Sequence, residues 1–309
     1  MELVKGMKIV TLGEGMIEIA GRIGQTGPIA YGGDVLNVTV ALARLGLAPA
    51  FLTALGTDAW SDELVGLWRN EGIDVAMIAR HPDRVAGLYG IRVDDQGERS
   101  FTYWRDRSAA RALLDMPESG ALLDRAAGAD LLFLSGITLS LYDAAGRERI
   151  ADIADAVRRH GGIVAFDGNY RPRGWADADA ARAAFADFAR HVTLALPTAG
   201  DEAMLHGEET PKVVARRWHD AGATEVVVKL GADGALVSTD AETALVPTVA
   251  VVPVDTSGAG DAFDAGYLAA RIAGQPPADA ARFGHRLAGE TIRHPGAIPP
   301  RAAVKDIRP

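Results

Sequence analysis

The chain has 309 residues, of which 48% are hydrophobic and 24% are charged, a composition typical of soluble globular proteins. Its net charge of −9 argues against a general nucleic-acid binder, and the absence of cysteine excludes disulfides, thiolate nucleophiles and thiolate metal sites. No stretch approaches the roughly 20 apolar residues of a membrane span and residues 1–6 lack the apolar core of a signal peptide, so we expect a cytoplasmic enzyme without a membrane or nucleic-acid partner.

Strand-like runs alternate with amphipathic helical runs over most of the chain. The expected strands are 8–12, 49–54, 130–134, 162–166, 192–196, 225–229 and 234–238, with a further extended, mostly apolar run at 245–254. The expected helices are 35–45, 62–71, 144–160, 211–221 and 262–273. This alternation predicts a single α/β domain, residues 1–309, whose mostly parallel sheet is covered by helices on both faces.

Two regions near the start depart from this alternation. Residues 16–20, 86–93 and 99–105 alternate apolar and polar side chains, and the turn 94–98 offers Gly97 for a positive φ. The pattern predicts a small β-sheet with strands drawn from about 14–33 and 86–106. Because these segments carry Tyr and Arg, we expect the sheet to project over the site as a lid. The alternative is an edge hairpin without a role.

A glycine-rich segment, Tyr31-Gly32-Gly33-Asp34-Val35-Leu36-Asn37, stands before the first expected helix. The glycines allow a ligand to approach the backbone, and Asp34 and Asn37 offer paired hydroxyl-binding groups on one turn. Asp34 as a plain N-cap of the helix is an alternative that the sequence leaves open.

Polar residues also follow two of the expected later strands. Asp167-Gly168-Asn169-Tyr170-Arg171-Pro172 follows the strand 162–166, where Arg171 could clamp a carboxylate or a phosphate through two N–H groups. Lys229-Leu230-Gly231-Ala232-Asp233-Gly234 joins two strands by a tight turn. That turn is either a plain hairpin or, beside an anion site, a loop that wraps a nucleotide.

Residues 255–263 form the most informative segment, Asp-Thr-Ser-Gly-Ala-Gly-Asp-Ala-Phe. The small residues Gly258, Ala259 and Gly260 leave N–H groups uncovered where a helix begins, and the helix dipole favours an anion there. Asp261 follows directly, which indicates a base that deprotonates an alcohol beside a site for transferring negative charge. Ordinary first-turn capping by Asp261 is the alternative.

Other common motifs do not fit the chain. Gly13-Glu14-Gly15 follows the first strand, but Glu18 stands where a dinucleotide motif has its third glycine. The sequence has no Gly-Lys pair for a P-loop, no His-Glu-x-x-His zinc motif and no Gly-x-Ser-x-Gly elbow. Phosphoryl transfer without a P-loop is the chemistry that remains.

The segments at 32–46 and 255–263 resemble the N-terminal and C-terminal signatures of the ribokinase-like (PfkB-type) carbohydrate kinases, and the resemblance extends over nearly the whole chain. It implies a three-layer α/β/α fold and ATP-dependent phosphorylation of a sugar hydroxyl, with Mg²⁺ bridging the phosphates and a monovalent cation such as K⁺ as a further candidate. Asp261 would be the base, and the amides of residues 258–260 would hold the phosphoryl group. The residues implied for the nucleotide are Asn169, Arg171, Lys229, Gly231, Asp233, Gly234, Gly258, Ala259 and Gly260.

Within the family, the chain is most similar to the 2-keto-3-deoxygluconate kinases, through residues 33–37, 103–105, 166–172 and 294–298. The resemblance implies transfer to the terminal (6-) hydroxyl of that sugar acid, with Asp261 facing the hydroxyl. Arg105 and Arg171 suit a carboxylate, which wants a planar two-donor partner. The residues implied for the sugar are Gly33, Asp34, Asn37, Tyr89, Tyr103, Arg105, Arg171 and Asp261.

The chain departs from the family pattern at the metal. The usual Asn-x-x-Glu is replaced by Thr198-Ala199-Gly200-Asp201-Glu202, so either Asp201 or Glu202 would hold a water on Mg²⁺. Both could equally be first-turn acids of the following helix.

Three rival functions stay open from the sequence. The nearest is a kinase of the same family that acts on a neutral sugar, fructose or ribose. A nucleoside kinase is disfavoured because aromatic residues are only 6% of the chain, and a sugar-binding pseudokinase is disfavoured because Asp261 and its loop are intact. We also expect a homodimer or higher homo-oligomer through the lid, since an exposed sheet with apolar residues on its outer face tends to pair with its copy.

Overall fold

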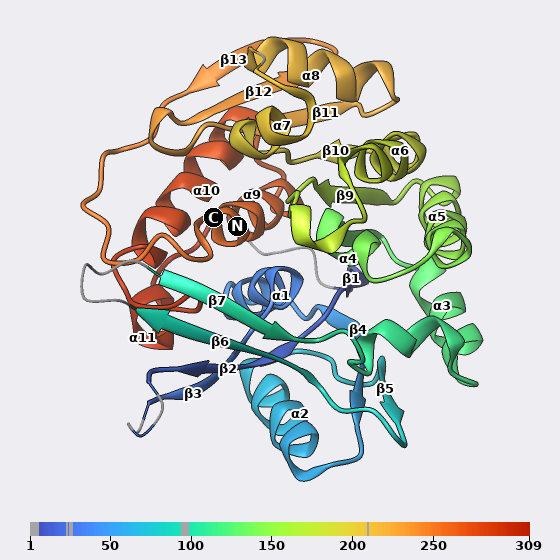
Figure 1. The fold of residues 1–309 in the computed structure, drawn as a ribbon. Coiled ribbons are helices and arrows are strands. Elements are labelled where there is room, and N and C mark those ends of the chain that lie inside the picture. The colour runs from blue at the N-terminus through green and yellow to red at the C-terminus, as the bar shows by residue number, and fades with distance from the viewer. Residues whose placement is uncertain (1–5, 23, 25–26, 94–98, 209) are drawn as a thin grey trace.

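The protein is organised around one large sheet. The computed structural model describes residues 6–22, 24, 27–93, 99–208 and 210–309. The strands of this sheet are β1 (Ile9–Leu12), β4 (Ala50–Gly56), β5 (Ile78–His81), β8 (Leu131–Ser135), β9 (Ile163–Asp167), β10 (Leu194–Ala195), β11 (Glu225–Lys229), β12 (Ala235–Thr239) and β13 (Thr243–Val246). Their order is β13-β12-β11-β10-β9-β8-β1-β4-β5, parallel from β11 to β5, with β12 and β13 added as antiparallel hairpin strands (Figure 1).

Helices cover the sheet on both faces. One face carries α1 (Asp34–Arg44), α2 (Ala59–Glu71), α9 (Ala259–Ile272) and α10 (Pro277–Thr291). The other carries α3 (Ser119–Ala127), α5 (Ala144–Arg159), α6 (Ala178–Ala189) and α8 (Pro211–Asp220). Shorter helices are α4 (Gly136–Ser140), α7 (Ala199–His206) and α11 (Arg301–Val304), with 3₁₀ turns at Ala110–Asp115, Pro172–Gly174 and Gly231–Asp233. None of the helices described is both long and apolar enough to cross a membrane.

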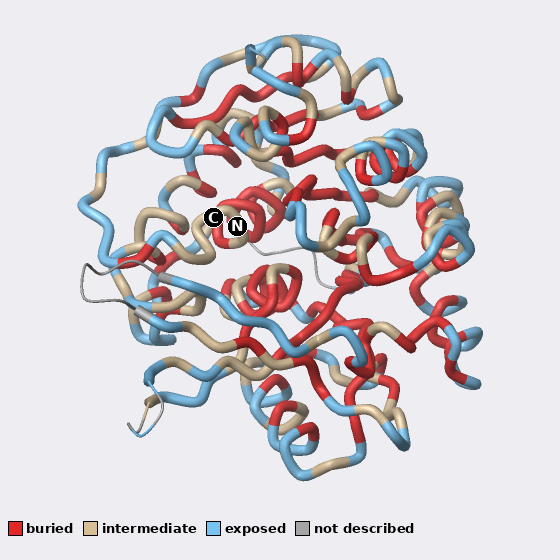
Figure 2. Tube along the Cα trace, in the orientation of Figure 1, coloured by how far each residue is buried: buried red, intermediate tan, exposed pale blue. Residues whose placement is uncertain are grey.

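Two hydrophobic cores result, one on each side of the large sheet. Along β8, Leu131 and Phe133 belong to the core under α1 and α9, whereas Leu132 and Leu134 belong to the core under α3 and α5. Successive side chains of a strand point to opposite faces, so an uninterrupted apolar run fills both cores. Figure 2 shows the buried strands running through the centre of the molecule between exposed helix faces. The predicted three-layer α/β/α architecture is confirmed.

A second, smaller sheet is also present, as predicted. Its strands are β2 (Met16–Ala20), β3 (Ile29–Gly32), β6 (Gly87–Val93) and β7 (Arg99–Trp104), in the order β3-β2-β6-β7 (Figure 1). The pair β6 and β7 is antiparallel, with Tyr89 opposite Tyr103. The expected turn at 94–98, with Gly97, lies outside the described residues.

Several expectations about individual elements were wrong. The run 245–254 is a strand only as far as Val246, and the rest is irregular and largely exposed, with Val254 N donating to Ile292 O at 2.8 Å. Helix α9 begins at Ala259 rather than at 262, so Gly260 and Asp261 lie in its first turn. Expected strand 192–196 shortens to two residues. The alanine-rich or glycine-containing helices α3, α6 and α10 and the short strand β5 were not predicted. Strand β3 falls within the expected range 14–33, and α7 is the helix whose first turn carries Asp201 and Glu202.

Candidate active site

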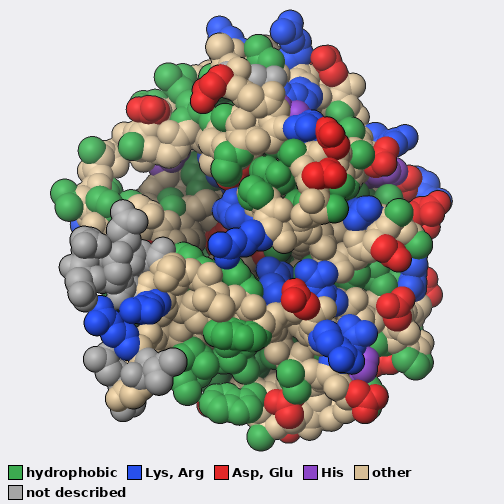
Figure 3. Space-filling model, viewed as in Figure 1, with side chains coloured by type: hydrophobic (Ala, Val, Ile, Leu, Met, Phe, Trp, Pro, Cys, Tyr) green, Lys and Arg blue, Asp and Glu red, His purple; other side chains and the backbone are tan. Residues whose placement is uncertain are grey.

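A cavity of about 760 Å³ lies at the carboxyl ends of the strands of the large sheet, with the small sheet as one wall. The surface in Figure 3 is hollowed left of its centre, with Lys and Arg side chains at the edge of the hollow. The small sheet contributes Met16, Glu18, Tyr89, Ile91, Phe101 and Tyr103. The opposite walls come from the first turns of α1 and α9 and from the loops after β9, β10 and β11. This is the edge at which ligands bind in open α/β sheets.

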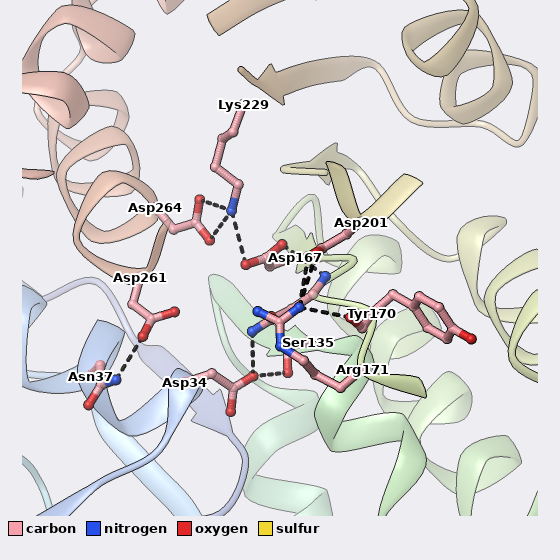
Figure 4. A network of polar contacts seen from close by, with 11 residues as sticks. Asp34, Asn37, Ser135, Asp167, Tyr170, Arg171, Asp201, Lys229, Asp261 and Asp264 are labelled. Carbon is pink, nitrogen blue, oxygen red and sulfur yellow. Dashed lines mark hydrogen bonds and ion pairs between the residues drawn. The ribbon is translucent and has the colours of Figure 1, made fainter. Parts of the chain in front are cut away.

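Asp261 is the carboxylate that faces this cavity from α9. Its Oδ2 accepts a hydrogen bond of 2.7 Å from Asn37 Nδ2, which joins the first turn of α9 to α1 (Figure 4). Burial, together with the nearby charge of Asp34, raises the pKa of Asp261 to about 7. A carboxylate with such a pKa can accept a proton near neutral pH, which suits a general base.

The loop before Asp261 presents backbone to the cavity. Gly258 caps α9 with φ 70°, a left-handed conformation that favours glycine, and a Cβ on it would lie 2.7 Å from the carbonyl oxygen of Ala297. Within the described residues no hydrogen bond uses the N–H of Gly258, whereas the N–H of Ala259 donates to Thr256 O at 3.3 Å. Of the three amides expected to hold a phosphoryl group, that of Ala259 is therefore partly engaged.

A buried aspartate holds this loop in place. Asp255 Oδ1 accepts from Ser257 N at 3.0 Å, and its Oδ2 accepts from Gly296 N at 2.5 Å. The segment 294–298, which carried part of the family resemblance, therefore supports the anion loop from behind.

Asp34 begins α1 and faces the cavity. The residue that caps this helix is Gly33, without a side-chain hydrogen bond, so the reading of Asp34 as a plain N-cap was wrong. Instead its carboxylate accepts hydrogen bonds from Ser135 Oγ and, at 3.2 Å, from Asn169 Nδ2. Burial raises the pKa of Asp34, and the Ser135 hydrogen bond opposes that rise. Asn169 has a left-handed φ of 36°.

Lys229 lies in a buried cluster with two aspartates. Its Nζ is 3.0 Å from Asp167 Oδ2 and 2.9 Å from Asp264 Oδ1. Burial opposes its charge, yet Asp167 and Asp264 raise the pKa of Lys229 above its usual value. The sequence analysis named Asp167 without assigning it a role, and it did not identify Asp264 as a site residue. The available signal was spacing, because Asp264 is three residues after Asp261 and so on the same side of α9.

Figure 4 shows the acidic side chains Asp34, Asp167, Asp261 and Asp264 arranged around one space, with Lys229 above it. The surrounding residues supply hydrogen-bond donors from four separate elements. A hydroxyl group held in this space would have several acceptors and one candidate base.

The two predicted arginines have carboxylate partners inside the protein. Arg171 Nη1 donates to Asp201 Oδ1 and Oδ2 at 3.0 and 3.1 Å, and Arg105 Nη2 contacts Glu14 Oε2. Both arginines line the cavity. For Arg105, Nε and Nη2 are buried, so Nη1 is the nitrogen that can donate to an anion in the cavity.

The two tyrosines of the small sheet also line the cavity, as expected. Their ring centroids are 5.9 Å apart, and Tyr89 OH donates to Glu18 Oε2. Burial, with Glu18 beside it, raises the pKa of Tyr89, so that the hydroxyl stays protonated.

Not every expected residue reaches the cavity. Glu202 does not line it: its oxygens accept from Trp218 Nε1 at 3.0 Å and from Arg217 Nη1 at 2.6 Å. Asp233 is exposed at the hairpin between β11 and β12 and does not line the cavity either, whereas Gly231 and Gly234 do. Of the two metal candidates, only Asp201 is on the cavity wall.

The described residues contain no group of three or more His, Cys, Asp or Glu side chains that could hold a metal by themselves. The donor set instead fits an ion that arrives with phosphates, because Mg²⁺ in kinases is held by one or two carboxylates, substrate phosphates and water. Asp201 and Asp167 supply carboxylate oxygens to the cavity wall.

The comparisons with known proteins agree with this geometry. The pattern of the pfkB family carbohydrate kinases matches residues 8–303. The chain is 40% identical over 305 residues to 2-dehydro-3-deoxygluconokinase of Escherichia coli K12, covering 96% of this chain and 98% of that one. The crystal structure of a PfkB protein from Polaromonas sp. JS666 has a TM-score of 0.84 and 28% identity, covering 97% and 99% of the two chains. The aminoimidazole riboside kinase from Salmonella enterica, solved with aminoimidazole riboside and an ATP analogue, has a TM-score of 0.77 and 25% identity, covering 94% and 95%.

The chain belongs to the pfkB family of carbohydrate kinases. Its fold is ribokinase-like, and it is an ATP-dependent carbohydrate kinase, as the resemblance of its two signature segments implied.

Proposed function

We propose that the enzyme transfers the γ-phosphoryl group of ATP to the 6-hydroxyl of 2-dehydro-3-deoxygluconate, which is 2-keto-3-deoxygluconate. The observation that carries the proposal is that a buried carboxylate, Asp261, and two guanidinium groups, Arg105 and Arg171, line one cavity. A sugar acid offers both a terminal alcohol for the first and a carboxylate for the second. Relatives named 2-dehydro-3-deoxygluconokinase, such as that of Escherichia coli K12, support this choice.

In this mechanism Asp261 accepts the proton of the 6-hydroxyl as its oxygen attacks the γ-phosphorus. The hydrogen bond from Asn37 fixes the carboxylate, and its proximity to the Gly258 loop aligns alcohol and phosphoryl group. The free N–H of Gly258 and the positive end of α9 stabilise the charge that spreads over the phosphoryl oxygens.

The sugar is held from two sides in this proposal. Gly33, Asp34 and Asn37 bind its hydroxyls from α1, and Tyr89 and Tyr103 cover it from the small sheet. The small sheet acts as a lid that excludes water before transfer, which limits hydrolysis of ATP.

ATP occupies the side of the cavity near β11 and α10. Gly231 and Gly234 allow the backbone to approach the nucleotide, and Asn169, Arg171 and Lys229 lie toward its phosphates. Apolar walls for the base come from the segment 248–251 and from Ile292, with His285 beside them. Burial lowers the pKa of His285, so it is neutral near pH 7 and adds no charge there.

Mg²⁺ would be held by Asp201 and Asp167 together with the phosphates, and when bound it neutralises charge on the β- and γ-phosphates. A monovalent cation such as K⁺ stays a prediction, tested by comparing turnover in potassium and sodium buffers.

A coupled ADP-release assay over a panel of sugars tests the proposal. We expect turnover with 2-keto-3-deoxygluconate to exceed that with fructose and ribose. Arg105→Ala should raise KM for the acid by tenfold or more, since a charge-assisted pair is lost, while KM for ATP changes little. Preference for a neutral sugar would replace this proposal by the neutral-sugar kinase, and no ATP consumption with any sugar of the panel would leave the sugar-binding pseudokinase.

A further inference from the structure

Behind Arg105 lies a second carboxylate, that of Glu14, which does not line the cavity. Its side chain is 1% exposed, and its Oε2 contacts Arg105 Nη2. Arg105 Nε is buried and has no hydrogen-bond partner among the described residues. The guanidinium is therefore held from the protein side by an ion pair at Nη2, and because Nε and Nη2 are both buried, Nη1 is the nitrogen that can face the cavity.

The backbone around Glu14 leaves it little freedom. A Cβ on Gly13 would lie 2.5 Å from Val35 Cβ, one on Gly15 would lie 2.5 Å from Trp68 Cη2, and one on Gly33 would lie 2.2 Å from the carbonyl oxygen of Glu14. The segment that carries Glu14 is therefore packed tightly against α1 and α2, and it contacts the start of α1, the helix that would bind the sugar hydroxyls.

Gly87 makes room for the carboxylate to reach Arg105. It opens β6 opposite Met16 of β2, and a Cβ there would lie 2.6 Å from Glu14 Oε1 and 3.2 Å from Arg105 Cβ. A side chain here would therefore displace the Glu14 carboxylate. Glu14, Gly87 and Arg105 therefore form one assembly at the point where the small sheet joins the large one.

We propose that Glu14 is the positioning residue for Arg105: by holding the guanidinium at the cavity wall it sets the affinity for the substrate's acid group. The inference rests on the proposed function in that Arg105 receives the carboxylate. Removing the charge of Glu14 also removes its repulsion of that carboxylate. Losing the contact between Glu14 and Arg105 has the larger effect on affinity. Glu14 touches the guanidinium directly, whereas its repulsion of the substrate carboxylate acts across the intervening guanidinium.

A kinetic double-mutant cycle tests the inference. We expect Glu14→Gln to raise KM for 2-keto-3-deoxygluconate about tenfold, the size of a charge-assisted hydrogen bond, with KM for ATP unchanged. In the Arg105→Ala background the same change should not raise KM for the acid, because Glu14 has lost the group it positions and only its repulsion of the acid is removed. Equal fold-changes in both backgrounds, or no change in either, would overturn the proposal.

A stability measurement separates this role from a purely structural one. Arg105→Ala leaves a buried carboxylate without its partner, so adding Glu14→Gln should raise the Tm above that of the single variant. The matched control is Glu71→Gln, which breaks another buried pair, Glu71 with Arg44 at 2.7 Å, away from the cavity. It should lower the Tm and leave every KM unchanged. A control that raises KM for the acid as much as Glu14→Gln does would show that lost stability alone explains the effect.

A second variant guards against misfolding of the first. Gly87→Ala keeps both charges, but its methyl group would overlap Glu14 Oε1, so the carboxylate must shift and the higher KM for the acid should be reproduced; an unchanged KM in a folded Gly87→Ala protein counts against the inference. KM for the acid is measured in every variant, even where a neutral sugar is the better substrate. A wild-type preference for a neutral sugar therefore refutes the proposed function alone, while an unchanged KM in Glu14→Gln refutes the role of Glu14 alone.

Discussion

Asp261 combines two properties that a general base needs, a fixed direction and a pKa near the working pH. Asn37 supplies the first through its hydrogen bond, and burial with the charge of Asp34 supplies the second. We expect Asp261→Asn to lower kcat by about 10²–10⁴-fold, because the amide cannot accept the proton of the alcohol. ATP binding, measured by calorimetry, should stay nearly the same. Unchanged kcat would remove Asp261 from the role of base.

The pKa of Asp261 also predicts how activity varies with pH. Because the base works as the carboxylate, kcat/KM for the sugar should rise with pH and level off above about 7. In Asp261→Asn, the residual activity should no longer show this fall at low pH.

The stability of the fold should vary with pH in the opposite direction. The folded pKa lies above the ordinary 3.8, so the folded state loses stability as pH rises from about 4 to 7. At pH 8, Asp261→Asn should therefore melt at a higher temperature than the wild type, and at pH 4 the two should melt alike.

Helix α9 brings the base and the anion loop to one place because its first residues follow a sharp left-handed turn. That turn depends on Gly258, whose φ of 70° and contact with Ala297 exclude a side chain. We expect Gly258→Ala to lower kcat at least tenfold by moving the loop, with a smaller effect on KM for the sugar. Steady-state kinetics on the folded variant would measure both.

Gly66→Ala is the matched control for this change. Gly66 lies within α2, and a Cβ there would meet no atom within 4 Å. Its replacement should leave kcat unchanged and stabilise the protein by about 0.5–1 kcal/mol, as expected for glycine within a helix. Full activity of Gly258→Ala would mean that the loop tolerates a side chain and that its shape is not needed for transfer.

Elements with a strong hydrophobic period were predictable, and those without one were not. Strands such as β8 and β11 are nearly all apolar, and α5 has a clear apolar stripe, so their positions follow from the sequence. Helix α6 is mostly alanine, which gives little contrast between its faces, and α10 starts at a proline after a short loop. The irregular segment after β13 lines the cavity, so its apolar residues face a binding site rather than a core. A run of valines reads as a strand in the sequence and does not distinguish these two cases.

Site residues that belong to a sequence motif could be predicted, whereas those placed by tertiary contacts could not. Asp261, Asp34 and Asn37 stand in two signature segments and lie on one cavity. That Glu202 turns to Trp218 and Arg217 instead depends on how α7 packs against α8, which adjacent acids in a sequence do not specify. Glu14 was considered only within a dinucleotide motif, since its partner Arg105 is 91 residues away along the chain.

At the scale of the whole molecule, the cavity lies between the carboxyl ends of the large sheet and the small sheet, and in the proposed function the small sheet would cover the sugar. The alternation of β2 and β7 assigns Glu18 and Tyr103 to the cavity and leaves Ile19 and Trp104 on the outer face. Ile19 is 42% exposed and Trp104 is 61% exposed, and Ile29, paired with Ile19 across β2 and β3, is 56% exposed. Large apolar side chains gathered on one outer face indicate an interaction surface.

We expect this outer face to pair with its copy, giving a homodimer through the small sheets. Light scattering coupled to size-exclusion chromatography should give about twice the chain mass of 32.5 kDa. Trp104→Glu should shift the protein toward monomer, because two charges would then be buried against each other in a symmetric interface. Met204→Glu on α7, a helix that Figure 1 shows well apart from the small sheet, is the control: Met204 is 57% exposed, and its replacement should leave the dimer intact. A wild-type monomer at micromolar concentration, or a dimer that Trp104→Glu does not weaken, would show that this apolar face is not a contact between copies. The small sheet would then act within a single chain.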